Sequence, residues 1–356
     1  MKRKPVAKKR PDNITNTATM KDRILLSHGS GGELTHRLIQ ELFVRHFDND
    51  RLRPLSDSAM LGECTGKMLF TTDSYVVDPI FFPGGDIGKL AVCGTVNDLA
   101  VAGAMPSYLT AGFIIEEGMP MEELERVADS MAQEARKAGV QIVAGDTKVV
   151  NKGKADKLYI NTSGVGFLHP RFNNHYEENT VKKGDQLIVN GNLGDHGVAV
   201  LAAREKLEIG PGIRSDCASL NGLIADLLDK TDGIRFMRDL TRGGLATVMC
   251  EVADHTGLGI HMDEGALPIH DQVRGVCEMM GLDPLYLANE GKFVLIVDPG
   301  SVDQLIDHLK ASPLGADACV VGEVVEQHPG RVVMETPIGG KRIIDKLTGE
   351  QLPRIC

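Results

Sequence analysis

A helix pattern that runs directly into a strand pattern is the feature that most constrains how this chain folds. Between Pro120 and Gly139, apolar residues recur at helical spacing, with proline at the start and glycine at the stop. The apolar run at residues 140–143 follows at once and predicts a buried strand. In α/β proteins, ligands lie at the ends of such strands. We therefore expect the polar run at residues 145–148 to form a ligand-binding loop.

Composition favours the same fold class. Tryptophan is absent, aromatic residues make up 4% of the chain and glycine occurs 40 times. The cores must therefore consist of Val, Ile, Leu and Ala, joined by many tight turns. This suits an α/β fold better than a β-sandwich. With 356 residues, of which 42% are hydrophobic, the chain is long enough for two domains.

Other patterns predict further elements and a domain boundary. We expect a strand at 68–75, a helix at 87–102, and later strands at 186–189, 293–297 and 320–325. A polar stretch at 169–184 separates the two blocks, and periodicity is lost from Ile343 onward. The predicted division is a disordered basic arm (1–20), an N-terminal domain (21–168), a C-terminal α/β domain (176–342) and a mobile tail (343–356).

Charge and cysteine usage narrow the class of protein. The formal net charge of −10 argues against nucleic-acid binding, which needs basic surface to neutralise phosphates. The basic run in residues 1–11 is the exception, and we expect it to be solvated and without a catalytic role. No long apolar span or leader occurs, and the seven cysteines form no C-x-x-C pair. These features predict a cytoplasmic protein that does not bind a membrane.

The last residue, Cys356, lies at the end of a short tether. A thiolate is the nucleophilic form of cysteine, and a chain end moves unless something docks it. Prenylation does not explain this thiol, because the cysteine of a prenylation motif is not the last residue. We interpret Cys356 as a swinging arm that carries a covalent substrate. A frayed end without a role is the plain alternative.

Several aspartates lie in or beside predicted strand ends, turns or helix starts. They are Asp57, Asp73, Asp98, Asp146 and Asp239. Any one of them alone reads as a helix cap or a turn former. As a set they predict a Mg²⁺ site, because Mg²⁺ takes oxygen ligands and bridges carboxylates to substrate phosphates.

Two glycine runs, at residues 28–32 and 242–244, each precede a predicted helix. Their N–H groups could face phosphate oxygens, or the runs could be plain tight turns. Neither fits a P-loop or a dinucleotide-binding fingerprint. Glu290, in a polar break between apolar segments, is a candidate base. Lys148 could stabilise anionic charge, although the pattern alone favours a surface pair with a nearby acid.

Taken together, these motifs resemble the HypE family of [NiFe]-hydrogenase maturation proteins, relatives of aminoimidazole ribonucleotide synthetase and selenophosphate synthetase. The likeness spans residues 24–356 and includes the runs 28–32, 71–74, 81–88, 96–98, 145–148, 194–197 and 289–291. The terminal run Pro353-Arg354-Ile355-Cys356 separates this family from its nucleotide-binding relatives.

The resemblance implies a two-domain aminoimidazole ribonucleotide synthetase-like α/β fold with a flexible C-terminal tail. It further implies that the protein binds ATP and Mg²⁺ and forms a homodimer through its N-terminal domain. It also implies the roles of individual residues. By this likeness the metal ligands are Asp57, Asp98 and Asp239, and the ATP-binding residues are Asp73, Asn97, Asp146, Thr147 and Thr241.

The implied reaction begins when a HypF-like carbamoyltransferase places a carbamoyl group on the sulfur of Cys356. ATP then drives dehydration of this group to a thiocyanate, with Glu290 as the base and Lys148 orienting the amide. The cyanide passes to iron on a HypC–HypD-like complex. Two alternatives stay open: a small-molecule kinase or synthetase with an incidental tail, and a non-catalytic scaffold.

Overall fold

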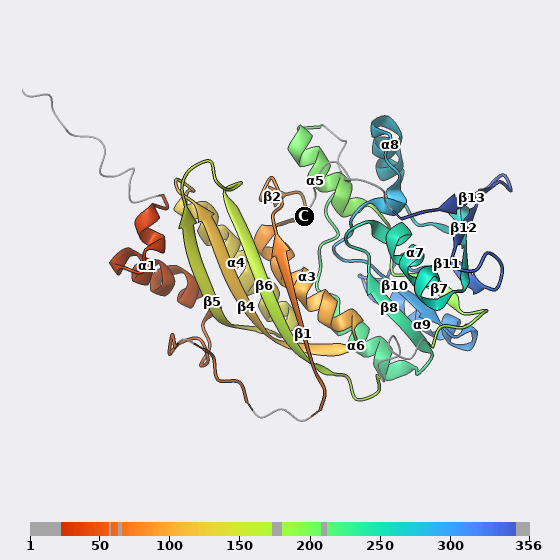
Figure 1. Cartoon of the computed structure of the whole chain (residues 1–356), viewed down its shortest axis with the longest axis horizontal. Helices are drawn as coiled ribbons and strands as arrows, with labels where there is room; N and C mark the ends of the chain where they lie inside the picture. Colours follow the sequence, from red (N-terminus) through yellow and green to blue (C-terminus); the bar gives the residue numbers. More distant parts are fainter. Residues whose placement is uncertain (1–22, 57, 63–65, 173–179, 208–211, 347–356) are drawn as a thin grey trace, which may run out of the picture.

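The computed structural model describes residues 23–56, 58–62, 66–172, 180–207 and 212–346. The predicted basic arm, Asp57 and Cys356 lie outside these residues. Two sheets organise the described chain, one built before residue 169 and one after residue 185. Helix α3 (Ile87–Val101) runs between them (Figure 1). The division into four segments stays our prediction.

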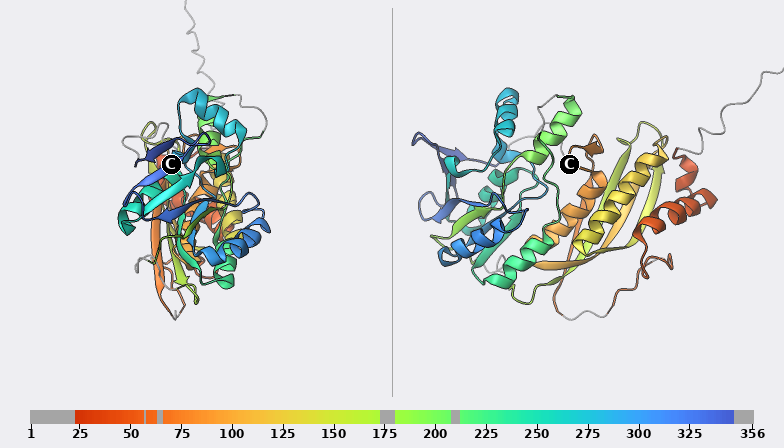
Figure 2. Two further views of the ribbon diagram at one scale, coloured as in Figure 1. Left: turned by 90° about the vertical axis from the view of Figure 1, so that its right-hand side faces the viewer. Right: turned by 180° about the vertical axis from the view of Figure 1, so that it is seen from behind.

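The first sheet has four strands in the order β1-β6-β4-β5. Their bounds are β1 (Met68–Tyr75), β6 (Leu158–Leu168), β4 (Ala104–Glu116) and β5 (Gln141–Val150). Only β4 and β5 pair in parallel. Helices α3 and α4 (Met121–Ala138) cover one face, as the view from behind in Figure 2 shows. Within the described residues, no helix covers the opposite face.

The predicted elements of this first block are found with one exception. Helix α4 ends at Gly139, which adopts the left-handed conformation with φ of 71°. The run at 145–148 is wrong as a loop, because it continues β5 through Val150. A Cβ at Gly145 would lie 2.6 Å from the Ala111 carbonyl oxygen, so the glycine permits close pairing with β4. Polar residues therefore belong to the strand here.

Short helices precede this sheet and pack beside β5. They are η1 (Leu26–Gly29), α1 (Glu33–Leu38), η2 (Ile39–Val44) and α2 (Arg45–Phe47). Phe43 stacks on Phe113 of β4 with ring centroids 4.5 Å apart. The hairpin of β2 (Phe81–Phe82) and β3 (Gly85–Asp86) leads into α3, where the Asp86 carboxylate accepts hydrogen bonds from the N–H groups of Gly88 and Lys89.

The second sheet has seven strands in the order β13-β12-β9-β11-β7-β10-β8. Their bounds are β7 (Gln186–Val189), β8 (Ile234–Asp239), β9 (Gly259–Asp263), β10 (Phe293–Val297), β11 (Cys319–Val325), β12 (Val332–Glu335) and β13 (Lys341–Ile344). The predicted strands at 186–189 and 293–297 are confirmed, and the one at 320–325 begins a residue earlier. The loss of periodicity expected from Ile343 is wrong by two residues, because Ile343 and Ile344 complete β13.

Helices cover both faces of the second sheet. Helix α7 (Gly244–Thr256) packs on one face, whereas α6 (Asn221–Lys230) and α9 (Val302–Lys310) pack on the other. Helices α5 (Asp195–Glu205) and α8 (Asp271–Met280) form a small apolar cluster of their own at one end. The remaining turns are η3 (Glu264–Ala266), η4 (Pro284–Tyr286) and η5 (Pro299–Ser301).

The two parts share their apolar cores at α3. Its Val92 and Val96 are fully buried in a cluster that also contains Cys217 and Ala288, which come from the later part of the chain. At the C-terminal end of the helix, Ala100 and Val101 join the core that α6 and α9 form with the second sheet. Helix α3 is thus the common wall of both parts. Among the described residues, no helix is long and apolar enough to cross a membrane.

Candidate functional site

A cavity of about 770 Å³ lies where the first sheet and α3 meet strand β8. Its walls come from β1, from α3, from β8 and from the turn that follows β8. Of the residues predicted from the sequence, five line this cavity: Asp73, Asp98, Asp239, Thr241 and Glu290. They come from four separate segments, so the fold brings together a set that is scattered along the chain.

Strand alternation directs one face of β1 toward α3. Successive residues of β1 alternate between exposed and more buried, and Thr71, Asp73 and Tyr75 fall on the more buried face. The Thr71 hydroxyl donates a hydrogen bond to Oδ2 of Asp98 at 2.9 Å. The Tyr75 hydroxyl donates to Oδ2 of Asp73 at 3.3 Å. Asp73 therefore lies near the end of β1, and Asp98 lies in α3, within the strand and the helix that the sequence predicts at 68–75 and 87–102.

Burial and mutual repulsion perturb the acids of the cavity. Burial raises the pKa of Asp98 to about 7, and the neighbouring charges of Asp239 and Asp73 add to this shift. Burial also raises the pKa of Asp239 to about 6. Oδ2 of Asp239 is buried and has no hydrogen-bond partner within the described residues. The site thus concentrates carboxylates that a cation would stabilise.

Mg²⁺ fits this donor set. Asp98 and Asp239 supply oxygen ligands, and the unpaired oxygen of Asp239 is of the kind that a divalent cation accepts. The third predicted ligand, Asp57, lies outside the described residues. In the described part of the chain, no group of three or more His, Cys, Asp or Glu side chains is arranged to hold a metal. A complete site therefore needs Asp57 or oxygen atoms of the substrate.

The cavity also contains arginine side chains that the sequence reasoning missed, although it singled out the glycine run that Arg242 opens. Arg235, Arg238 and Arg242 line it beside the acids. Arg235 is engaged by Asp185 at 3.2 Å and by Asp298 at 3.1 Å. Arg238 makes an exposed ion pair with Glu251, at 3.2 Å. Arg238 and Arg242 can therefore meet the phosphate oxygens of a nucleotide.

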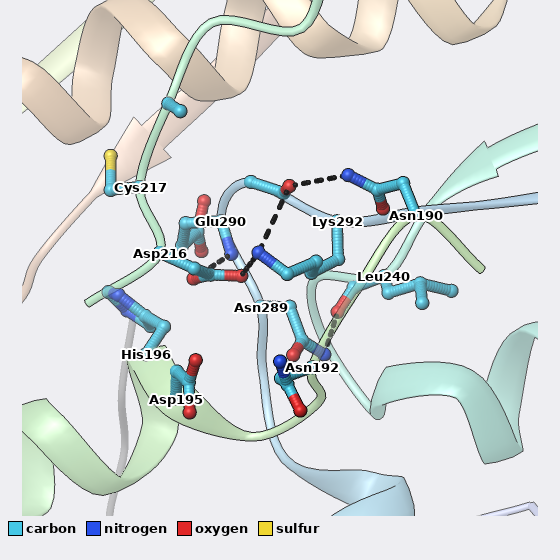
Figure 3. Close-up of polar contacts among 12 residues, drawn as sticks. Asn190, Asn192, Asp195, His196, Asp216, Cys217, Leu240, Asn289, Glu290 and Lys292 are labelled. Atoms are coloured by element: carbon cyan, nitrogen blue, oxygen red, sulfur yellow. Dashed lines mark hydrogen bonds and ion pairs between the residues drawn. The ribbon is translucent and has the colours of Figure 1, made fainter. Parts of the chain in front are cut away.

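Glu290 belongs to the loop that enters β10. It is 3% exposed and yet lines the cavity. Figure 3 shows it beside Asp216 and Lys292, and its main-chain N–H donates to Oδ1 of Asp216 at 3.0 Å. Nearby, His196 is fully buried, and burial lowers its pKa to about 4. Glu290, the candidate base, thus lies among buried polar side chains.

Asn97 does not line the cavity. It is 2% exposed, and its side-chain amide donates to the carbonyl oxygens of Ala218 at 3.0 Å and Glu290 at 3.3 Å. Its side-chain oxygen accepts the N–H of Leu220 at 2.8 Å. These bonds use the carboxamide to join α3 to the segment before α6. Its contact with ATP stays a prediction from the resemblance.

Asp146, Thr147 and Lys148 line a second pocket, of about 340 Å³, beside β5 and the N-terminal helices. Lys148 pairs with Asp146 at 3.7 Å, and both side chains are largely exposed, as the surface-pair interpretation expects. Strands β5 and β1 are the two edges of the sheet. Three strand spacings put these edges about 14 Å apart, so one chain does not bring Lys148 to Glu290.

Both glycine runs have a packing role. A Cβ at Gly29 would lie 2.5 Å from the main-chain nitrogen of Val149, and one at Gly244 would lie 2.4 Å from the carbonyl oxygen of Leu285. Each run therefore lets the backbone pass close to a neighbouring segment. These close approaches agree with the interpretation of the two runs as tight turns. A contact between either run and phosphate stays a prediction.

Comparisons with known proteins agree with this architecture. Residues 56–168 match the N-terminal domain of AIR synthase related proteins, and residues 182–335 match the C-terminal domain. The carbamoyl dehydratase HypE of Rhodobacter capsulatus is 51% identical and covers 94% of this chain and 98% of its own. A crystal structure of hydrogenase maturation protein HypE in complex with ATP has a TM-score of 0.88 and 46% identity, over 93% of this chain and 99% of that chain.

A crystal structure of a HypE–HypF complex is also similar, with a TM-score of 0.75 and 47% identity, over 87% of this chain and 99% of that chain. The resemblance first seen in the motifs thus extends over nearly the whole chain and over its fold. The chain belongs to the HypE family of carbamoyl dehydratases, with the two-domain AIR synthase-like fold of that family.

Proposed function

We propose that this chain uses ATP to dehydrate a carbamoyl group carried on the sulfur of Cys356. The product is a thiocyanate, which becomes the cyanide ligand of the [NiFe]-hydrogenase iron centre. The observation that supports this most is the cavity that joins Glu290 to Asp73, Asp98 and Asp239. A base and an acid set suited to a metal–nucleotide complex share one space there.

The chemistry explains why ATP is needed. An amide oxygen is a poor leaving group, and its transfer to phosphate makes it a good one. The carbamoyl oxygen attacks the γ-phosphorus of ATP, and ADP leaves. Loss of both amide protons and cleavage of the carbon–oxygen bond then gives S–C≡N and inorganic phosphate. The oxygen of the carbamoyl group ends in the phosphate, so the net change is removal of water.

Each residue of the cavity has its own role in this proposal. Glu290 takes a proton from the amide nitrogen, because it lines the cavity in which the nucleotide binds. Arg238 and Arg242 bind phosphate oxygens. Asp73 and Thr241 contact the nucleotide, as the resemblance implies. Asp98 and Asp239 hold Mg²⁺, which when bound neutralises the charge of the phosphates.

Lys148 and Asp146 can join this site only from a second chain. They lie at the edge of the first sheet opposite to β1 and the cavity. If Lys148 orients the amide and Asp146 and Thr147 contact the same nucleotide, β5 of one chain must approach β1 of its mate. The geometry of the strands thus supports a homodimer with shared sites.

The uncovered face of the first sheet suits such a dimer. Met68, Phe167 and Met105 are direct cross-strand neighbours on β1, β6 and β4. Met68 is 60% exposed and Met105 is 43% exposed. Phe70, which is 68% exposed, extends this apolar row. Contiguous exposed apolar surface marks an interaction site, so we assign this face to the second chain.

The partners follow from the same chemistry. The similar HypE–HypF complex supports a HypF-like carbamoyltransferase as the donor of the carbamoyl group. A HypC–HypD-like complex with iron would accept the cyanide. Both exchanges take place in the cytoplasm in this proposal.

Phosphate release from ATP tests this function. The full-length chain, carbamoylated by its HypF-like partner, should release about one phosphate per Cys356, and the Cys356→Ser variant should release none. Glu290→Gln should also block release, because the amide proton is then retained. A small-molecule kinase with an incidental tail would instead show turnover with a free substrate in the Cys356→Ser variant, and this result would overturn the proposal.

A further inference from the structure

A buried ion pair lies beside Glu290 (Figure 3). Nζ of Lys292 is 3.3 Å from Oδ2 of Asp216, and the two side chains are only 14% and 3% exposed. Lys292 also donates to the carbonyl oxygen of Gly291, at 3.5 Å. Burial of two charges is costly, and an apolar pair of similar volume often stabilises a protein equally well. A role beyond stability is therefore worth seeking.

The Asp216 carboxylate holds the main chain of Glu290. Its Oδ1 accepts the N–H of Glu290 at 3.0 Å, while its Oδ2 faces Lys292. The two segments approach backbone to backbone, because a Cβ at Gly291 would lie 2.0 Å from the carbonyl oxygen of Asp216. A charged acceptor makes a stronger bond to N–H than a neutral one does. Lys292 places its positive charge against the other oxygen of this acceptor.

The other end of the Glu290 residue is fixed as well. Its carbonyl oxygen accepts the side-chain N–H of Asn97 at 3.3 Å and the main-chain N–H of Ala218 at 3.4 Å. Asn97 comes from α3, which carries Asp98 in the next position. Glu290 is thus held to the wall that bears the predicted metal ligand. Its carboxylate can shift only by rotation about its own side-chain bonds.

We propose that Asp216 and Lys292 are positioning residues for Glu290. The ionised pair fixes the main chain of Glu290 so that its carboxylate meets the amide nitrogen at the correct distance. This inference rests on the proposed role of Glu290 as the base. It assigns a function to two residues that neither line the cavity nor belong to the predicted site.

The chain contains a matched control for this pair. Asp185 is 2% exposed, accepts the N–H of Lys182 at 2.7 Å and pairs with Arg235 at 3.2 Å. It therefore makes the same two kinds of contact as Asp216, but it holds a turn that does not contain the base. Asp185→Asn removes a buried charge of the same type without touching the Glu290 loop, and Arg235, which lines the cavity, keeps its pair with Asp298 at 3.1 Å. Any loss that only reflects stability should appear in this variant too.

The test measures the single-turnover rate of dehydration on the carbamoylated full-length chain, the KM for ATP and the melting temperature. We compare three variants with the parent. The first is a double variant that combines Asp216→Asn and Lys292→Met. The others are the conservative variant Lys292→Arg and the control Asp185→Asn. The double variant leaves no lone buried charge, so it should fold. We expect its rate at saturating ATP to fall at least about 10-fold with the KM within about 2-fold of the parent. Lys292→Arg should retain most of the rate.

Two outcomes would overturn the inference: a folded double variant with the parental rate, or an equal loss of rate in Asp185→Asn. Should this double variant fail to fold, the double variant that combines Asp216→Asn with Lys292→Gln serves in its place with the same expectation, because it also leaves no lone buried charge. Glu290→Gln separates this inference from the proposed function. If Glu290→Gln dehydrates at the parental rate, the base assignment fails. If Glu290→Gln is inactive while the double variant is unimpaired, only the positioning role fails.

Discussion

Asp98 of α3 and Asp239 at the end of β8 face one cavity, although 141 positions separate them in the chain, and the pKa of each carboxyl group is raised. Burial is the main cause, and the negative charge of Asp239 is the next cause for Asp98. In the absence of a cation this arrangement opposes folding at neutral pH. It becomes favourable when a divalent cation is bound. In the proposed function, the site therefore gives up stability for the capacity to bind a metal–nucleotide complex.

Asp98→Asn should stabilise the metal-free protein at pH 8. The folded-state pKa of Asp98, about 7, lies above its ordinary value of 3.8, so the protonated form is favoured by folding. The contribution of Asp98 to the free energy of unfolding is fully present below pH 3.8 and is lost as pH rises toward 7. We expect a gain of roughly 1 to 3 kcal/mol at pH 8 that shrinks toward pH 4. Urea unfolding of both proteins at the two pH values measures it. An equal gain at both pH values would contradict this account.

His196→Gln should make the protein less sensitive to acid. Burial lowers the pKa of His196 from 6.5 to about 4, so the neutral form is favoured by folding. Its contribution to stability is present above pH 6.5 and is lost as pH falls through 4. The difference in unfolding free energy between parent and variant should narrow by roughly 1 to 3 kcal/mol between pH 7.5 and pH 4.5. Equal pH dependence of the two proteins would show that His196 is not the group responsible.

Gly291→Ala should damage both stability and activity. The new Cβ would meet the Asp216 carbonyl oxygen at 2.0 Å, which forces apart the two segments that hold Glu290. We expect a loss of about 1 to 3 kcal/mol, as for other overpacked sites, together with a slower dehydration step. Gly222→Ala is the control, because a Cβ there meets nothing within 4 Å and lies in helix α6. Chemical denaturation and single-turnover kinetics compare the two. If Gly291→Ala changes neither the stability nor the dehydration rate, the close approach of the Gly291 and Asp216 segments is refuted.

Met68→Asp should dissociate the proposed homodimer. Met68 belongs to the apolar row on the uncovered face of the first sheet, and a buried carboxylate at an interface is costly. We expect a monomer in sedimentation velocity, together with loss of phosphate release. Ile338→Asp is the control, because Ile338 is 95% exposed in a turn outside this face. If the Met68→Asp protein stays dimeric, the dimer interface does not lie on this face of the sheet.

The elements that could be predicted from the sequence are those whose signals are local. Helix α4 has a continuous apolar stripe and a glycine stop, and β10 is five consecutive apolar residues that are all buried. The run at 145–148 failed because its polar side chains belong to a strand at the edge of the sheet, one face of which is uncovered. A polar strand of this kind has the composition of a loop.

The candidate site could be predicted only in part. Chemistry and the resemblance selected Asp73, Asp98, Asp239 and Glu290, and the fold brings these four to one cavity. Arg238 and Arg242 were missed, because an arginine near a strand end gives no signal until the facing wall is known. The pairing of Lys292 with Asp216 spans 76 positions and depends on two loops. The nearest sequence signal was a lysine inside a polar break before an apolar strand.

Intact-mass spectrometry of the C-terminal peptide tests the central claim most directly. After carbamoylation by the HypF-like partner, Cys356 should gain about 43 Da, and it should then lose about 18 Da only when Mg²⁺ and ATP are added. This pair of changes is the signature of a thiocarboxamide that is dehydrated to a thiocyanate. A Cys356 that never gains mass, or that keeps the carbamoyl group unchanged in the presence of ATP, would contradict the carrier mechanism.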